Sequence, residues 1–201
     1  MNQLTPRTEK AIAIALQQHR GNHRKINGLP EVTHPFKVYR IAKLYTANED
    51  ILIATLLHDV PDDTGGYGLP EIRRDFGENV ATIVADLICS QYNMASLSSN
   101  WRERKETMLQ RLNSFTPAQA FIYTCDKIHD MESLIKDCRK HGDSVWDKFN
   151  APPDQKRWYY TEVVPILRVR CPESALLNRL EKAWQELSPL IPRSFMTRCS
   201  T

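Results

Sequence analysis

Apolar residues recur every three to four positions along most of this chain, which is the spacing of amphipathic α-helices. The first such segment starts at Thr5-Pro6, where a capping residue is followed by proline at the first helical position, and its apolar stripe covers residues 11–16. A second segment runs from Pro35 to about Tyr45 with its apolar side chains on one face. The pattern therefore predicts two helices that each bury one side.

The third segment is the most apolar. Asn48 can cap it, and its body reads ILIATLL, which is apolar on nearly all sides. A helix of this kind is normally buried in the middle of a domain. Pro61 lacks a backbone donor and disfavours helical structure at Val60, so we expect the helix to stop there.

The rest of the chain continues the helical pattern, without strand-like alternation or an internal repeat. Two helices joined near Gly77 are expected within 70–88, and a long one starts at Thr116 with Pro117 at its first position. Further helices are expected within 101–115, 155–170 and 172–188, and the polar stretch 90–100 predicts a mobile loop. The prediction is an all-α fold, a single helical bundle of roughly eight to ten helices. We place this one domain at 1–192 and a flexible tail at 193–201.

Composition narrows the possible functions. A net charge of +3 with scattered basic residues argues against binding to DNA or RNA, which usually takes a strongly basic patch. No apolar run is long enough to cross a membrane, and the start of the chain lacks the apolar core of a signal peptide. The five cysteines form no metal-binding or disulfide pattern. We therefore expect a cytoplasmic protein with reduced thiols and no membrane partner.

The end of the third helix carries the first sign of chemistry. His58-Asp59 closes the apolar run, and Asp62-Asp63 follows at once. Acids and histidines are common near helix ends, so a purely structural interpretation exists. However, three carboxylates around one buried helix end repel each other and resist burial. A divalent cation removes that conflict, and imidazole with carboxylate suits Zn, Mn, Fe or Co rather than Ca.

Further metal ligands must come from elsewhere in the chain. His34 stands just before the second helix, in VTHPFKVYR. Asp126 lies within an otherwise apolar helical stretch, where a buried carboxylate needs a partner. His129 and Asp130 follow on the same helix, and His129 is as consistent with a core position as with a site role.

Taken together, the ordered set RK…THPFKV…ATLLHDVPDDT…EIRRDFGENVATIV…DKIHDM resembles the HD superfamily of metal-dependent phosphohydrolases. Within it, the set is most similar to the RelA/SpoT hydrolase domain and its stand-alone forms, the small alarmone hydrolases. The resemblance covers about 10–165 and implies an Mn²⁺-dependent enzyme that removes the 3′-pyrophosphate of guanosine tetra- and pentaphosphate. It also implies a small-molecule nucleotide as the partner, and nothing in the pattern specifies an oligomeric state.

The resemblance also implies roles for individual residues. The family's four metal ligands fall on His34, His58, Asp59 and Asp126, and the acidic pair that positions and activates the attacking water falls on Asp62 and Asp63. Residues expected to contact the substrate are Arg24, Lys25 and Arg157, with Lys105 as a looser match. The family has glutamate where this chain has Asp62, so that side chain is shorter by one methylene.

Two departures from the family pattern bear on the substrate. Where the family has asparagine and arginine after its last metal ligand, this chain has Asp130 and Glu132. Both changes add negative charge, which should weaken the binding of a polyanion by repulsion. Asp130 could instead bond a ribose hydroxyl or take part in the metal region. Two alternatives therefore stay open beside alarmone hydrolysis: an HD nucleotide phosphatase of different specificity, and a nucleotide-binding HD regulator without catalysis.

Overall fold

The structure is a computed structural model, and it describes residues 4–60, 66–88 and 101–193. Within those ranges the chain forms nine α-helices, two short 3₁₀-helices and no strand, only an isolated bridge between His23 and Pro30. The all-α prediction is confirmed. The expected loop at 90–100 and nearly all of the expected tail at 193–201 lie outside the described residues.

The N-terminal helices begin where the sequence signals place them. Helix α1 (Pro6–Gln18) is capped by Thr5, whose Oγ1 accepts from the backbone N–H of Thr8 at 3.1 Å. Helix α2 (Thr33–Ala42) begins two residues earlier than expected and ends three residues sooner. Helix α3 (Glu49–Leu57) is capped by Asn48. Gly77 separates α5 (Leu69–Phe76) from α6 (Glu78–Ala85), and its φ of 93° lies in a region that glycine enters without strain.

The C-terminal half is built around one long helix. Helix α8 (Pro117–His141) starts with a capping box, in which Thr116 and Gln119 each satisfy the other's backbone N–H. After the 3₁₀-helix Gly142–Lys148 come α9 (Pro153–Arg170), α10 (Ser174–Leu187) and the short turn Ser188–Leu190. Helix α7 (Trp101–Leu112) packs beside α9.

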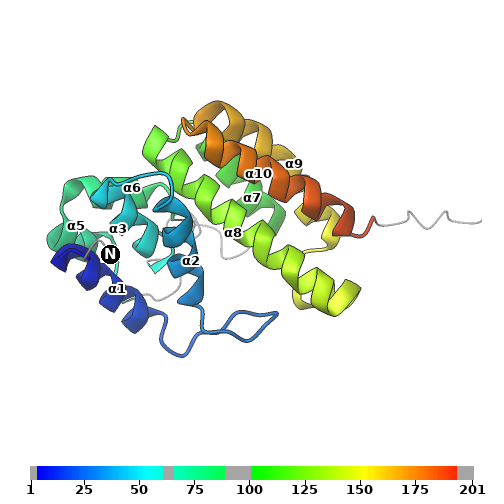
Figure 1. The fold of residues 1–201 in the computed structure, drawn as a ribbon, viewed down its shortest axis with the longest axis horizontal. Coiled ribbons are helices and arrows are strands. Elements are labelled where there is room, and N and C mark those ends of the chain that lie inside the picture. The colour runs from blue at the N-terminus through cyan, green and yellow to red at the C-terminus, as the bar shows by residue number, and fades with distance from the viewer. Residues whose placement is uncertain (1–3, 61–65, 89–100, 194–201) are drawn as a thin grey trace, which may run out of the picture.

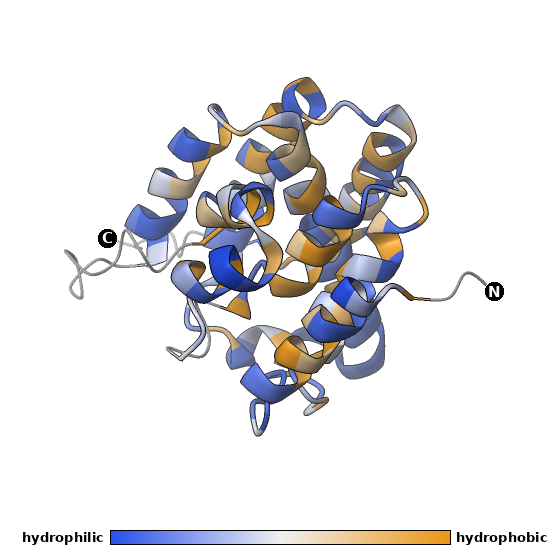
Figure 2. Cartoon of the chain, turned by 90° about the vertical axis from the view of Figure 1, so that its left-hand side faces the viewer, coloured by the Kyte–Doolittle hydropathy of each residue, from blue (hydrophilic) through white to orange (hydrophobic). Residues whose placement is uncertain are grey.

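Helix α8 is the axis of the bundle. In Figure 1 it crosses the middle of the molecule, with α1, α2, α3, α5 and α6 on one side and α9 and α10 on the other. It packs against α2 and α10, and α2 in turn packs against α3. Apolar residues gather toward the interior and polar residues toward the outside (Figure 2). None of the helices in the described ranges has the length and apolarity that a membrane span requires.

Burial explains why α3 lies at the centre of the N-terminal half. All residues from Leu52 to Leu57 are buried, as the all-round apolar pattern predicts. The helix ends at Leu57 with His58 as its C-terminal cap, somewhat before the predicted stop at Val60. Because α2, α3 and α8 pack on one another, the start of α2, the end of α3 and the middle of α8 come to the same place.

Candidate active site

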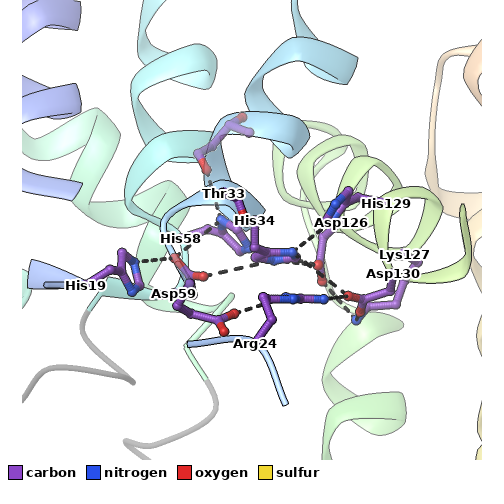
Figure 3. A network of polar contacts seen from close by, with 12 residues as sticks. His19, Arg24, Thr33, His34, His58, Asp59, Asp126, Lys127, His129 and Asp130 are labelled. Atoms are coloured by element: carbon purple, nitrogen blue, oxygen red, sulfur yellow. Dashed lines mark hydrogen bonds and ion pairs between the residues drawn. The ribbon is translucent and has the colours of Figure 1, made fainter. Parts of the chain in front are cut away.

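Three of the predicted metal ligands meet where these helices converge. His34 lies in the first turn of α2, His58 at the end of α3, and Asp126 in the middle of α8, and all three are buried. Nε2 of His34 lies 3.2 Å from Oδ1 of Asp126, and Nε2 of His58 lies 4.0 Å from the same oxygen. One potential ligand atom from each residue falls within 4.8 Å of the others (Figure 3).

The backbone of α3 sets the orientation of the His58 ring. Nδ1 of His58 lies 2.8 Å from the carbonyl oxygen of Thr55. Since a carbonyl only accepts, Nδ1 carries the proton in this contact. In the neutral ring the lone pair is then on Nε2, the atom that faces Asp126. This outer hydrogen bond holds the tautomer that a metal ion requires.

Asp59, the fourth predicted ligand, lies at the edge of the same cluster. Its Oδ2 is 3.9 Å from Nε2 of His34, and its Oδ1 is 3.3 Å from Nε2 of His19. His19 is the C-terminal cap of α1 and is buried against the site. Sequence reasoning missed His19, because it stands in a polar stretch and only the packing of α1 on α3 brings it to Asp59.

The donor set fits a divalent transition metal. Two imidazoles and two carboxylates are the combination that Mn²⁺, Zn²⁺, Fe²⁺ and Co²⁺ accept, and here they come from the start of α2, the end of α3 and the middle of α8. His34, His58, Asp59 and Asp126 would hold such an ion. His34 and His58 each lie close to both carboxylates, at 3.2 to 4.0 Å, so the two imidazoles connect the two sides of the site.

Charge in this cluster is strongly coupled. Burial by itself disfavours the charged form of His34, but the hydrogen bond to Asp126 and the nearby carboxylates outweigh it and raise its pKa to about 9. Burial also opposes ionisation of Asp59, yet the charges of His58, His34 and His19 lower its pKa to about 2. A protonated His34 thus neutralises carboxylate charge that a cation would otherwise neutralise.

A second polar layer lies beside the cluster on α8. Lys127 is buried, and its Nζ bridges Oδ2 of Asp126 at 2.9 Å and Oδ2 of Asp130 at 2.8 Å. Burial disfavours the Lys127 ammonium, but these two carboxylates outweigh it and hold its pKa well above the usual range. Nδ1 of His129 lies 2.8 Å from Nδ1 of His34, and burial lowers the pKa of His129 to about 4. His129 therefore belongs to the site rather than to a separate core region.

The two acidic departures from the family pattern have different surroundings. Asp130 faces the site, where Lys127 offsets its charge and Arg24 lies 3.9 Å away. Glu132 points to α10 instead and accepts hydrogen bonds from Nε and Nη2 of Arg179 at 2.7 and 2.9 Å. The expectation that Glu132 makes the site more negative is wrong, because two helical positions place it on another side of α8.

An open pocket of about 410 Å³ adjoins the cluster on the Asp130 side. Four basic residues line it, Arg24, Lys25, Arg104 and Lys156. Aromatic side chains of Trp101, Phe149 and Tyr160 form part of its wall. A basic pocket with aromatic surface next to a metal-binding cluster suits a ligand that combines phosphate groups with a flat ring.

Not every residue expected to contact the substrate lines this pocket. Arg24 and Lys25 do. Lys105 instead places its ammonium over the ring of Tyr159, 5.0 Å from the centroid. Arg157 donates from Nη2 to the carbonyl of Ile191, and its neighbour Lys156 lines the pocket. One step along a helix turns a side chain by about 100°, so these two neighbours on α9 face different directions. A substrate contact by Arg157 stays a prediction.

The acidic pair Asp62 and Asp63 lies outside the described residues. The described ranges stop at Val60, directly after the metal-binding cluster, and resume at Gly66, which precedes the buried Tyr67. The role of the pair as handler of the attacking water therefore stays a prediction from the sequence.

Comparison with known proteins places this geometry in a family. The model of the HD domain matches residues 11–153. A GTP pyrophosphokinase of Streptomyces coelicolor is 32% identical over 130 residues, which cover 63% of this chain and 14% of that protein. A guanosine-3′,5′-bis(diphosphate) 3′-pyrophosphohydrolase of Haemophilus influenzae is 29% identical over 128 residues, covering 60% of this chain and 18% of that protein. The chain thus spans less than a fifth of these curated relatives.

A solved structure has nearly the same extent as this chain. It is described as a metazoan orthologue of SpoT that hydrolyses ppGpp, and it superposes with a TM-score of 0.76 at 22% identity. The match covers 92% of this chain and 98% of that one. At this identity the likeness establishes a common fold.

Proposed function

The chain belongs to the HD-domain family, and on this premise we propose that it is a metal-dependent phosphohydrolase that removes the 3′-pyrophosphate of guanosine tetra- or pentaphosphate. The observation that carries the proposal is the convergence of His34, His58 and Asp126 beside a basic, aromatic pocket. The names of the Haemophilus and metazoan relatives support the substrate. We further propose Mn²⁺ as the metal and the cytoplasm as the location.

Each group in the site has a defined task in this reaction. His34, His58, Asp59 and Asp126 would hold the cation, which would supply Lewis-acid polarisation and lower the pKa of a water. Asp62 and Asp63 would orient the attacking water and accept its proton. Arg24, Lys25 and Lys156 offset the negative charge of the phosphate groups. The ammonium of Lys127 pairs with the carboxylates of Asp126 and Asp130. It favours the ionised form of Asp126, offsets the negative charge of Asp130 and holds both side chains in position.

A turnover assay tests the proposal directly. The protein is incubated with guanosine tetraphosphate and Mn²⁺, and nucleotides and released phosphates are separated by chromatography, with an EDTA control. GDP plus pyrophosphate, lost with EDTA, is the expected result. Release of orthophosphate instead would point to a phosphomonoesterase, and nucleotide binding without any turnover would point to a regulatory domain.

The charge of Lys156 predicts a pH dependence of substrate binding. Burial lowers its pKa to about 8. The nearby Asp130 carboxylate raises this pKa, whereas the positive charges of Lys105, Lys127 and Lys25 lower it further. Lys156 therefore carries its positive charge below about pH 8 and loses it above. We expect KM to rise roughly three- to tenfold between about pH 7 and pH 9. In Lys156→Arg, which stays charged, this rise should disappear, and an equal rise in that variant would contradict the assignment.

The different surroundings of Asp130 and Glu132 predict different effects of neutralising them. Asp130→Asn removes a carboxylate from the pocket and leaves Lys127 with one carboxylate partner, Asp126, instead of two, so KM should fall about three- to tenfold. Glu132→Gln should leave KM within about twofold, because Glu132 contacts α10. Steady-state kinetics at low salt measures both. A higher KM in Asp130→Asn would show instead that Asp130 accepts a hydrogen bond from the substrate.

A further inference from the structure

Four residues on α8 connect the metal-binding cluster to the far end of the pocket. Asp130, Ser133, Leu134 and Asp137 all line it, and their spacing of three and four puts them on one face of the helix. Asp130 and Asp137 are two helical turns apart, about 10 Å along the axis. This separation is comparable to the length of a nucleoside. A substrate whose phosphate groups lie near Asp126 and Asp130 would therefore bring its base to the level of Asp137.

Asp137 differs from the other acids of the pocket. Glu31 pairs with Arg24 at 3.0 Å, and Asp130 pairs with Lys127 at 2.8 Å. Asp137 is only 8% exposed as a whole residue, but its carboxylate oxygens are not fully enclosed, and they are open to the pocket that the residue lines. Within the described ranges no hydrogen bond or ion pair holds this carboxylate, so it is available to accept hydrogen bonds from a ligand, and such bonds to a charged acceptor are strong ones.

The walls beside Asp137 suit a flat base. Trp101, Phe149 and Tyr160 line the same pocket, and Nζ of Lys156 lies 3.8 Å from the centre of the Phe149 ring. Aromatic faces stack on any base and so give affinity without discrimination. Hydrogen bonding at the edge of the base must then supply the discrimination.

We propose that Asp137 is the residue that selects guanine. The Watson–Crick edge of guanine presents two neighbouring donors, N1–H and the N2 amino group, and a carboxylate offers two acceptor oxygens to match them. Adenine presents the N1 lone pair and a single amino group there, so its N1 faces the negative charge. This inference rests on the proposed function, which names a guanosine substrate, and adds to it the residue that selects the base.

The experiment compares guanosine, inosine and adenosine 3′,5′-bis(diphosphate) as substrates of the full chain. The wild-type protein should prefer guanosine to adenosine in kcat/KM by about 100-fold or more, with inosine between them because it lacks the amino group. Asp137→Asn keeps one acceptor and should lower kcat/KM for guanosine about 30- to 1000-fold, while adenosine changes less than about threefold. Asp147→Asn, the same change at an exposed residue of the 3₁₀-helix, should match the wild type.

Base selectivity separates this role from a structural one. A variant that merely loosens the fold loses guanosine and adenosine turnover alike, and that result would overturn the inference. A wild-type protein that does not discriminate between the bases would overturn it too. If none of the three substrates is turned over, the proposed function fails, and the role of Asp137 is then tested by calorimetric binding of GDP and ADP. Tighter binding of GDP than of ADP that is lost in Asp137→Asn would support the role of Asp137 in selecting guanine. Equal binding of GDP and ADP by the wild type would contradict that role.

Discussion

Asp59→Ala should abolish both metal binding and turnover. The substitution removes a negatively charged ligand, whose Oδ2 lies 3.9 Å from Nε2 of His34, and leaves two imidazoles with Asp126. We expect Mn²⁺ affinity to fall at least about 100-fold and turnover at least about 1000-fold. Electron paramagnetic resonance of free Mn²⁺ measures the first, and release of pyrophosphate measures the second.

A folding control shows whether Asp59→Ala loses the metal site alone or the whole fold. The Asp59 side chain is 17% exposed and lies at the edge of the cluster, so the variant should keep the helical circular dichroism signal of the wild type. Asp147→Ala, at an exposed position, should keep both metal affinity and turnover. If Asp59→Ala turned over substrate at the wild-type rate, the ligand assignment would be wrong.

Asp63→Ala should separate the two properties that Asp59→Ala removes together. Asp63 follows Asp59 by four positions, and its predicted task concerns the water rather than the cation. Loss of a positioned general base typically costs about 100- to 10,000-fold in rate. We therefore expect turnover to fall by this factor while the Mn²⁺ affinity stays within about threefold of the wild type.

The shortened arm at Asp62 supplies a companion measurement. Asp62→Glu restores the side-chain length of the family pattern. If the shorter arm misplaces the water by about 1 Å, the longer one should raise kcat, because rates are sensitive to placement on this scale.

For Asp63→Ala, loss of Mn²⁺ binding would contradict the separate roles of Asp59 and Asp63, since it would make Asp63 a metal ligand.

Local signals in the sequence determined most of the helices. Thr5, Asn48 and Thr116 begin helices because each offers a side-chain oxygen to orphan backbone donors, which is a property of a few neighbouring residues. The all-round apolar body of α3 indicated its burial for the same reason. The predicted end positions of α2 and α3 were less accurate, because packing rather than a cap or a proline decides where these helices stop.

The metal-binding cluster was accessible from the sequence because its members lie in a recognisable order. His34, His58 and Asp126 stand far apart in the chain, and the structure brings them together as the resemblance implies. No local pattern by itself would have paired them. Periodicity fixes which residues share a helix face, and it carries no information about which helices meet.

Only the tertiary structure decided the partners of the remaining charges. Packing of α1 on α3 brings His19 to Asp59, and packing of α10 on α8 removes Glu132 from the site. The turn of α9 exposes Lys156 to the pocket in place of Arg157. A charge is identical in the sequence whether it lies in the pocket or against another helix. Its energetic role follows from distance and burial, and both exist only once the helices have packed.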